Sequence, residues 1–330
     1  MPELPEVEVV RAGLAPAVTG ARIVGAQVLD PRALKRHVPT SGDDGLGGHG
    51  VTLTEAAGVS RSADFERRVT GLELGAPERR GKFIWIPTSG VSGAGDRIAL
   101  LAHLGMSGQV LLRAHDAPDD RHVRIRIWVE HPEHGELRVD FADQRLFGSL
   151  ALDALRPAAD GLGEVPAQAS HIARDPLDPA FDDQGWIAAL RARSAGVKKL
   201  LLDQTLASGV GNIYADEALW RARLHPDTAG RSLSARKAAE LLTVLRAVFA
   251  QALMEGGTSF DEQYVNVNGQ AGYFAHSLNA YGRTGEPCAR CGTPIKRIAF
   301  GGRGSHLCPR CQRRRPPVGR ITEQASSPRD

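Results

Sequence analysis

The first half of the chain alternates hydrophobic and polar positions with the period of two that β-strands show. Residues 123–129 (VRIRIWV) follow this pattern, and residues 137–141 (LRVDF) repeat it after an HPEHG turn. Residues 83–86 and 98–101 are short apolar runs of strand length. Together with a short helix at the N-terminus, these strands predict a β-sandwich or barrel.

Two segments rich in glycine and serine are expected to lie outside the strands. Residues 87–97 are expected to form a flexible connection between two strands, and residues 41–50 a second loop. Both have the composition of tolerated insertions rather than of functional sites.

The pattern of the second half is helical. Ser232 or Ser234 can cap a helix that Gly256 and Gly257 end. The apolar positions of this helix fall on one face: Leu241, Leu242, Leu245, Val248, Phe249 and Ala252. Shorter helices are expected over residues 186–193, 198–205 and 213–223.

Length and local composition predict several domains. A chain of 330 residues suits more than one folded unit, and Pro, Ala, Asp and Gly accumulate between residues 155 and 179, as in a linker. We therefore predict an α+β multidomain protein. Its expected parts are a β domain (2–150), a linker (151–180), a helical domain (181–284), a cysteine module (285–312) and a disordered tail (313–330).

The composition is that of a soluble globular protein, with 42% hydrophobic and 24% charged residues. The first ten residues carry acidic side chains where a signal peptide would carry basic ones and an apolar core. Apolar runs such as residues 98–102 are too short to cross a bilayer. We therefore expect a cytoplasmic protein without a membrane partner.

The net charge of +3 is modest, but the positive charge is concentrated near the C-terminus. Between Cys288 and Arg320 there is no Asp or Glu. The cations of this stretch are Arg290, Lys296, Arg297, Arg303, Arg310, Arg313, Arg314, Arg315 and Arg320. A solvated basic tail is one explanation, but a cysteine framework that folds the segment favours a nucleic-acid surface.

All four cysteines lie in two CxxC pairs, Cys288/Cys291 and Cys308/Cys311, with sixteen residues between the pairs. This spacing predicts a tetrahedral zinc site, because each knuckle aims two thiolates at one point. Disulfides are the weaker alternative in a reducing compartment. Residues 295–300 and 301–307 are expected to form a β-hairpin between the knuckles. Its turn presents Arg303, either to a phosphate backbone or simply to solvent.

A short glycine turn, Ser208-Gly-Val-Gly-Asn212, lies between two predicted helices. It can be plain punctuation, with Asn212 as a helix cap. Alternatively, its small residues can let a phosphate approach the N-terminus of the second helix.

The chain opens with MPELPEVE, in which Pro5 and Glu6 suit the first turn of a helix. That explanation does not cover Pro2. Removal of the initiator Met would leave Pro2 with a secondary α-amine, whose pKa of about 8 makes it a nucleophile near neutrality. Such an amine attacking a sugar C1′ gives an iminium that accepts electrons in later steps. Glu3 could then handle protons.

Several motifs in order resemble those of the formamidopyrimidine-DNA glycosylase family. They are MPELPEVE at the start, RRGK at 79–82, HLGMSG at 103–108, DQRLFG at 143–148, GVGNIY at 209–214 and the terminal cysteine module. The resemblance runs from Met1 to about Gln312. The chain is also similar to the sister endonuclease VIII enzymes, but ELPEV at the start and residues 143–148 favour the purine-directed branch.

The family resemblance implies an N-terminal β-sandwich with flanking helices, a helix–two-turn–helix domain and a zinc β-hairpin, with DNA between the domains. It implies that Pro2 is the Schiff-base nucleophile, Glu3 its proton-handling partner and Glu6 a supporting residue. Lys82 and Arg303 would contact the phosphates that flank the lesion.

The resemblance also implies residues that turn the damaged nucleotide out of the duplex and fill the gap. Met106 would be an apolar probe, Phe147 a flat wedge, and Arg145 a donor to the orphaned opposite base. Taken singly, without the neighbouring motifs, Met106 and Phe147 are better interpreted as core residues and Arg145 as a surface cation.

Further DNA contacts are implied for His103, Asn212, Tyr281 and Lys198. The family motif has a proline after this lysine, where the chain has Lys199. Residues 263–281 correspond to a lesion-recognition loop.

The predicted function is therefore that of a bifunctional DNA glycosylase and AP lyase of base excision repair. It would excise oxidised purines such as 8-oxoguanine and formamidopyrimidines through a Schiff base at Pro2, followed by β- and δ-elimination. The expected partner is duplex DNA with oxidised bases or abasic sites, bound by a monomer at the nucleoid. The expected cofactor is one structural zinc ion, since four thiolates leave no open coordination position. The alternatives are an endonuclease VIII-like enzyme for oxidised pyrimidines and a non-catalytic protein that binds damaged DNA.

Overall fold

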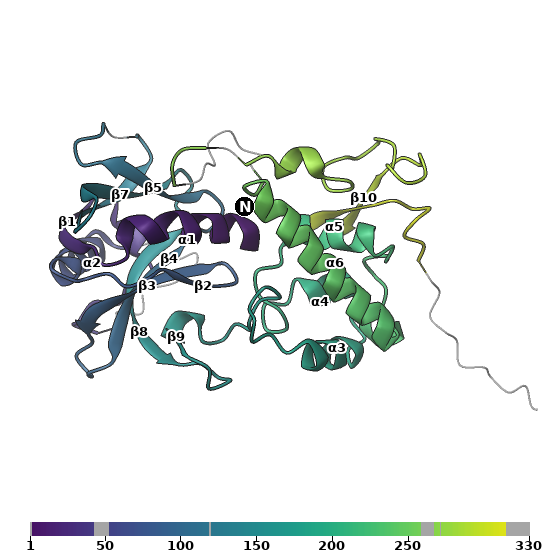
Figure 1. The fold of residues 1–330 in the computed structure, drawn as a ribbon, viewed down its shortest axis with the longest axis horizontal. Coiled ribbons are helices and arrows are strands. Elements are labelled where there is room, and N and C mark those ends of the chain that lie inside the picture. Colours follow the sequence, from purple (N-terminus) through teal and green to yellow (C-terminus); the bar gives the residue numbers. More distant parts are fainter. Residues whose placement is uncertain (1, 43–52, 119, 259–266, 271, 315–330) are drawn as a thin grey trace, which may run out of the picture.

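The computed structural model describes residues 2–42, 53–118, 120–258, 267–270 and 272–314. The chain forms two lobes (Figure 1). The strands β1 to β9 and helices α1 and α2 make the first lobe, and helices α3 to α6 with a C-terminal hairpin make the second. The N-terminal end of α1 reaches the second lobe beside α6 (Figure 1).

Two antiparallel sheets form the first lobe, as the alternating pattern predicted. One has the order β1 (Arg22–Val28), β6 (Val123–His131), β7 (Gly135–Asp143) and β5 (Gly108–Ala114). The other has the order β2 (Glu78–Arg80), β3 (Phe83–Val91), β4 (Arg97–His103), β8 (Ser149–Pro157) and β9 (Glu164–Pro166). Val123, Ile125, Ile127 and Val129 of β6 are buried, whereas Arg124, Arg126 and Trp128 are partly exposed.

Three helical segments accompany these sheets. They are α1 (Leu4–Val18), the 3-10 turn η1 (Pro31–Leu34) and α2 (Glu55–Val69). Val7, Val10, Leu14 and Val18 of α1 recur at helical spacing and pack into the same core as the inner strand residues. This burial fixes α1 on the sandwich, with its first residues pointing at the second lobe.

The structure differs from the sequence prediction in two places in this lobe. Residues 87–91 continue β3. Pro87 lies beyond the short β2 and has no N–H to donate, but its carbonyl accepts from the Gly75 amide at 2.7 Å, so the strand tolerates it. The first part of the segment expected to be a linker, residues 151–180, instead belongs to the sheet: β8 runs to Pro157 and β9 follows, and their Leu152 and Val165 are buried. The other predicted loop, residues 41–50, lies largely outside the described residues.

The second lobe is helical, as predicted. Its helices are α3 (Asp183–Arg191), α4 (Val197–Leu201), α5 (Asn212–Arg221) and α6 (Ala235–Met254), with 3-10 turns η2 (Ala167–Ala169) before them, η3 (Gly230–Ser232) and η4 (Phe274–Ser277). Ser234 caps α6 by accepting a hydrogen bond from the Lys237 amide at 3.1 Å. The six predicted apolar positions of this helix are all buried. The cap of α5 is Gly211 rather than Asn212, which is the first helical residue.

The C-terminal hairpin pairs β10 (Lys296–Phe300) with β11 (Arg303–Leu307). Gly301 and Gly302 form the turn with φ angles of 50° and 75°, which suit the two-residue turn that follows the twist of a hairpin. Arg303 pairs with Phe300 directly beside the turn. Among the described helices, none is both long and apolar enough to cross a membrane.

Candidate active site and nucleic-acid interface

A pocket of about 280 Å³ contains the N-terminal residue predicted to react. It is lined by Pro2, Val7, Lys82, His103, Leu104, Gly105, Met106, Phe147 and Arg303. The structure thus brings together six predicted site residues that come from five separate parts of the sequence: Pro2, Lys82, His103, Met106, Phe147 and Arg303. Arg303 belongs to the second lobe, so the pocket lies between the lobes.

Glu3 is buried at the N-terminus of α5. Its carboxylate accepts hydrogen bonds from the amides of Ile213 at 3.0 Å and Tyr214 at 3.4 Å. Burial raises the pKa of Glu3, while the nearby Lys82 ammonium opposes this shift. A side chain at Gly211 would place its Cβ 2.2 Å from Glu3 Cδ. The glycine turn therefore makes room for a carboxylate of the protein itself.

Glu6 joins three segments that are distant in sequence. Its Oε2 accepts from the Glu3 amide at 2.8 Å. Its Oε1 accepts from the Tyr214 hydroxyl at 2.5 Å, and from the Thr258 amide and hydroxyl at 2.7 and 2.8 Å. Each of these groups is buried, so a hydrogen bond left unmade here would cost about 1–3 kcal/mol. Glu6 thereby fixes the start of α1, and with it Pro2, against the second lobe.

Lys82 enters the pocket from the turn between β2 and β3. Its ammonium donates to the Val210 carbonyl at 3.3 Å. Burial lowers its pKa, and Glu3 acts in the opposite direction. Gly81 precedes it with φ of +57°, and a Cβ there would lie 2.7 Å from the Ser208 side chain. The glycine turn therefore lets the second lobe approach the first lobe closely, both at Glu3 and beside Lys82.

Met106, Arg145 and Phe147 are presented by two loops that touch through their backbones. A Cβ at Gly105 would lie 2.5 Å from the Phe147 carbonyl carbon, and one at Gly148 would lie 2.9 Å from two carbonyl oxygens of the other loop. Phe147 and Met106 are each 38% exposed, which is high for large apolar side chains at the edge of a pocket. Their exposure fits contact with a ligand better than a place in the core.

Asp143 holds these two loops in register. Its Oδ1 accepts from the Ser107 hydroxyl at 2.5 Å and from the Arg145 amide at 3.0 Å, and its Oδ2 accepts from the Gly148 amide at 2.6 Å. The Asp143 side chain therefore defines the backbone on both sides of Leu146, while the Arg145 side chain remains exposed.

Asp216 of α5 anchors the hairpin that carries Arg303. It accepts hydrogen bonds from the Ser305 hydroxyl and the His306 amide, both at 2.8 Å. The Lys198 ammonium pairs with it at 2.7 Å, and both side chains are almost completely buried. Burial lowers the pKa of Lys198, and Asp216 opposes that shift. In this structure Lys198 therefore contacts the hairpin from beneath rather than lining the pocket.

Asn212 and Tyr281 lie at the same junction. The Asn212 amide group donates to the Gly304 carbonyl at 3.1 Å, and the Tyr281 ring packs edge-on against His306 with centroids 4.9 Å apart. The Glu217 carboxylate holds the segment of Tyr281 by accepting from the amides of Ala280 at 2.8 Å and Tyr281 at 3.0 Å. Both predicted contact residues are thus adjacent to the strand that begins at Arg303.

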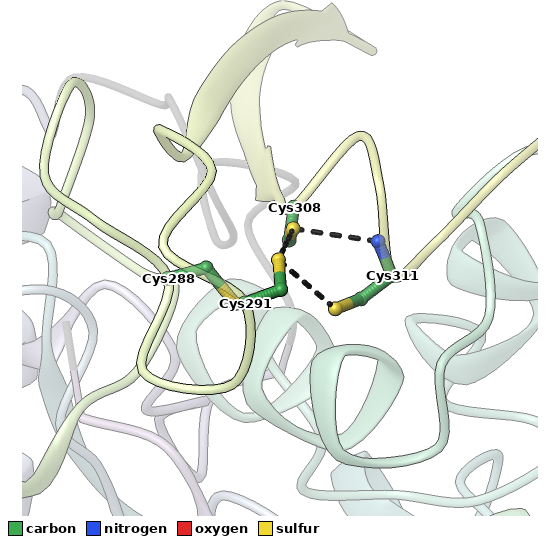
Figure 2. A group of neighbouring side chains, drawn as sticks. All are labelled: Cys288, Cys291, Cys308 and Cys311. Carbon is green, nitrogen blue, oxygen red and sulfur yellow. Dashed lines mark hydrogen bonds between the residues drawn. The ribbon is translucent and has the colours of Figure 1, made fainter.

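The four cysteines converge at the base of the hairpin (Figure 2). Their sulfur atoms all lie within 4.8 Å of one another, close to the separation of about 3.8 Å that tetrahedral Zn–S bonds of 2.3 Å require. Cys288 and Cys308 are buried, and the other two are partly so. Arg290, between the first pair, stacks on Trp220 of α5 with its guanidinium carbon 3.7 Å from the ring centroid. This donor set suits one structural zinc ion.

Several of these groups were not identified from the sequence. Tyr214 and Thr258 bind Glu6, and Asp143, Asp216 and Glu217 organise loops through buried carboxylates. Adjacent acids at 216 and 217 inside an otherwise apolar stretch are the one local signal that could have indicated the last two.

Comparison with known proteins covers nearly the whole chain. Residues 1–150 match the family model "Formamidopyrimidine-DNA glycosylase N-terminal domain", residues 172–263 the "Formamidopyrimidine-DNA glycosylase H2TH domain", and residues 285–314 the "Zinc finger found in FPG and IleRS".

Full-length relatives and solved structures agree with these matches. The chain is 56% identical to a formamidopyrimidine-DNA glycosylase of Leifsonia xyli subsp. xyli, over 95% of this chain and 100% of the relative. It is 50% identical to that of a Nocardioides species, over 99% and 98%. The crystal structure of Lactococcus lactis Fpg with DNA containing an abasic site superposes with a TM-score of 0.72 at 28% identity, over 94% of this chain and all of that one. A structure of MutM with DNA containing carbocyclic 8-oxo-G matches with the same TM-score and identity, over 95% and 100%.

Proposed function

Because this chain belongs to the formamidopyrimidine-DNA glycosylase family, we propose that the pocket between its lobes is the active site and that Pro2 is its nucleophile. The chain is a DNA glycosylase and AP lyase of base excision repair that acts on oxidised purines in duplex DNA. One zinc ion, held by the four cysteines, is structural. The observation that supports the catalytic assignment best is the position of Pro2 in one pocket with Lys82 and Arg303, directly before the buried Glu3.

The reaction begins when the secondary amine of Pro2, freed by removal of the initiator Met, attacks C1′ of the damaged nucleotide. The nitrogen lone pair forms the new N–C1′ bond, and the bond from C1′ to the base breaks. The base leaves with the electron pair of the broken bond and takes up a proton, while the Pro2 nitrogen gives up its own proton and so regains the lone pair that the next step uses. Opening of the sugar ring then gives a covalent iminium, and β- and δ-elimination from it release the two flanking phosphates.

Glu3 is the group that moves protons in these steps. Its raised pKa, caused mainly by burial, keeps a larger protonated fraction than an exposed glutamate has. In that form it can protonate the sugar oxygen as the ring opens. The Lys82 ammonium stabilises the carboxylate that remains. Glu6 keeps this geometry in place by its hydrogen bonds to both lobes.

The target nucleotide must leave the base stack to reach Pro2, which costs a few kcal/mol of stacking and pairing. Phe147 and Met106 fill the gap as apolar wedges, and Arg145 donates to the base left without a partner. Lys82 and Arg303 bind the phosphates on either side of the lesion, and these charged contacts offset part of that cost.

The remaining residues bind the backbone of the same strand. His103, Asn212 and Tyr281 approach it around the pocket and the hairpin. Lys198 acts from below, by holding the hairpin through Asp216. This enzyme works at the nucleoid in the cytoplasm, where its duplex substrate is.

A lesion panel tests this function. Duplexes that differ only in one base, 8-oxoguanine, a formamidopyrimidine or 5-hydroxycytosine, are incubated with enzyme in excess and analysed for strand cleavage. We expect the purine lesions to be excised fastest, with phosphate left on both sides of the gap. A preference for 5-hydroxycytosine, or excision without cleavage, would contradict the proposal.

A further inference from the structure

We propose that Lys35 is a positioning residue that holds the wedge loop, residues 143–148, in the conformation that inserts into DNA. Its ammonium group donates a hydrogen bond of 2.5 Å to the carbonyl of Leu146, which lies 111 residues away in sequence. Leu146 is flanked by the two residues proposed to enter the duplex, Arg145 and Phe147. The inference rests on the proposed role of that loop.

Leu146 has an unusual backbone conformation. Its φ of 56° lies in the left-handed region, where a leucine side chain crowds its own carbonyl, and it is one of two such non-glycine residues in the described chain. A rotation of Leu146 into an ordinary conformation would turn the next peptide and redirect Phe147. Some contact must therefore hold this residue in place.

Asp143 and Lys35 hold different backbone groups of the wedge loop. Asp143 fixes the amides of Arg145 and Gly148, one residue before and two residues after Leu146. The hydrogen bond from Lys35 fixes the carbonyl between them. Burial lowers the pKa of Lys35 and the Asp143 carboxylate opposes that shift, so the two residues that fix the loop also interact electrostatically.

Lys35 itself stands on a rigid support. Lys35 directly follows η1. The buried Arg61 of α2 donates hydrogen bonds to the carbonyls of Leu34 and His37 on either side of it. His37 is further fixed by Asp64 at 3.0 Å and by the Leu152 amide of β8 at 3.2 Å. The position of the wedge loop is thereby tied to α2 and to the second sheet.

The experiment combines Lys35→Met with Leu146→Gly in a double-mutant cycle. Glycine adopts positive φ without strain, so the strain that Lys35 is proposed to oppose is absent in the Leu146→Gly background. The readout is the fluorescence of 2-aminopurine placed opposite a tetrahydrofuran abasic-site analogue, together with the single-turnover excision rate of 8-oxoguanine. Lys35→Met should lower excision roughly tenfold, because small displacements of positioned groups have effects of this size. It should also reduce the fluorescence change on binding.

In the Leu146→Gly background, the same Lys35→Met change should alter excision by less than about twofold. An equal loss in both backgrounds, or no loss in either, would overturn the proposal. The matched control is Lys237→Met, which removes another ammonium that donates to a carbonyl, that of Ala222 at 2.6 Å, in the second lobe. It should leave the fluorescence change unaltered. If Lys35→Met does not fold, Lys35→Leu, which also has no hydrogen-bond donor in its side chain, provides the same test.

Hydrogen exchange of the free protein separates this proposal from the wedge role itself. Lys35→Met should speed the exchange of the Arg145 and Gly148 amides, and Lys237→Met should not; unchanged exchange would overturn the proposal without any reference to DNA. Phe147→Ala tests the wedge role alone. If it leaves the fluorescence change intact, the wedge role fails while the exchange result still stands.

Discussion

Gly211→Ala is the substitution whose effect follows most directly from the geometry of the site. The φ of Gly211 is −126°, so alanine fits the backbone, but its Cβ would lie 2.2 Å from Glu3 Cδ and 2.3 Å from Glu3 Oε1. An ordinary carbon–carbon contact needs about 3.5 Å, so the carboxylate must move by about 1 Å. A displacement of this size in a positioned catalytic group costs about 100-fold in rate, or about 2.7 kcal/mol in the barrier.

The assay is single-turnover excision of 8-oxoguanine by Gly211→Ala, compared with Gly93→Ala, whose Cβ would meet no atom within 4 Å. We expect a loss of about 100-fold for the first variant and none for the second. Binding to a duplex with an abasic-site analogue should change little, because the phosphate-binding residues are not displaced. Activity of Gly211→Ala within about threefold of wild type would refute the assignment of Glu3 as a positioned proton carrier.

Three further predictions concern stability and the hairpin. Burial raises the pKa of Glu3 above its ordinary value of 4.5, so the folded state loses stability as the pH rises from 4.5 through the raised pKa. Glu3→Gln should therefore raise the melting temperature more at pH 8 than at pH 4. An equal change at both pH values would contradict burial as the cause. Asp216→Asn leaves the Lys198 ammonium buried without its partner and should lower the free energy of unfolding, measured in urea, by about 3–5 kcal/mol. Adding Lys198→Met to this variant should restore most of that loss. A double variant no more stable than Asp216→Asn would exclude the ion pair as the reason. Metal analysis should find one zinc per chain, and Cys308→Ser should lose that zinc together with affinity for abasic DNA; undiminished affinity would show that the hairpin is not needed for binding.

Local patterns predicted the parts of the fold that depend on neighbouring residues. The alternation in β6, the cap and apolar face of α6 and the Gly-Gly hairpin turn are each set by a few adjacent side chains. The composition of residues 155–179 was misleading over its first part, because β8 runs to Pro157 and the short β9 obtains its apolar partners from the sheet and needs no dense apolar run of its own.

The site could be predicted where one short motif carries the chemistry. The two CxxC pairs, whose sulfur atoms the structure brings together, are of this kind. The Pro2–Glu3 dipeptide is another such motif, and its role is the one proposed above. The contacts of Glu6 are not, since Tyr214 and Thr258 lie 208 and 252 residues away and are brought to it only by packing of the lobes. The burial of Lys198 and the hold of Lys35 on Leu146 are likewise tertiary properties, which no periodicity in the sequence reports.

The most direct test of the central claim is the mass of the peptide that borohydride fixes to DNA containing 8-oxoguanine. The account predicts a single adduct on the peptide that begins at Pro2, in protein from which the initiator Met has been removed. An adduct on the peptide that contains Lys82, or equal trapping by protein that retains the initiator Met, would contradict it.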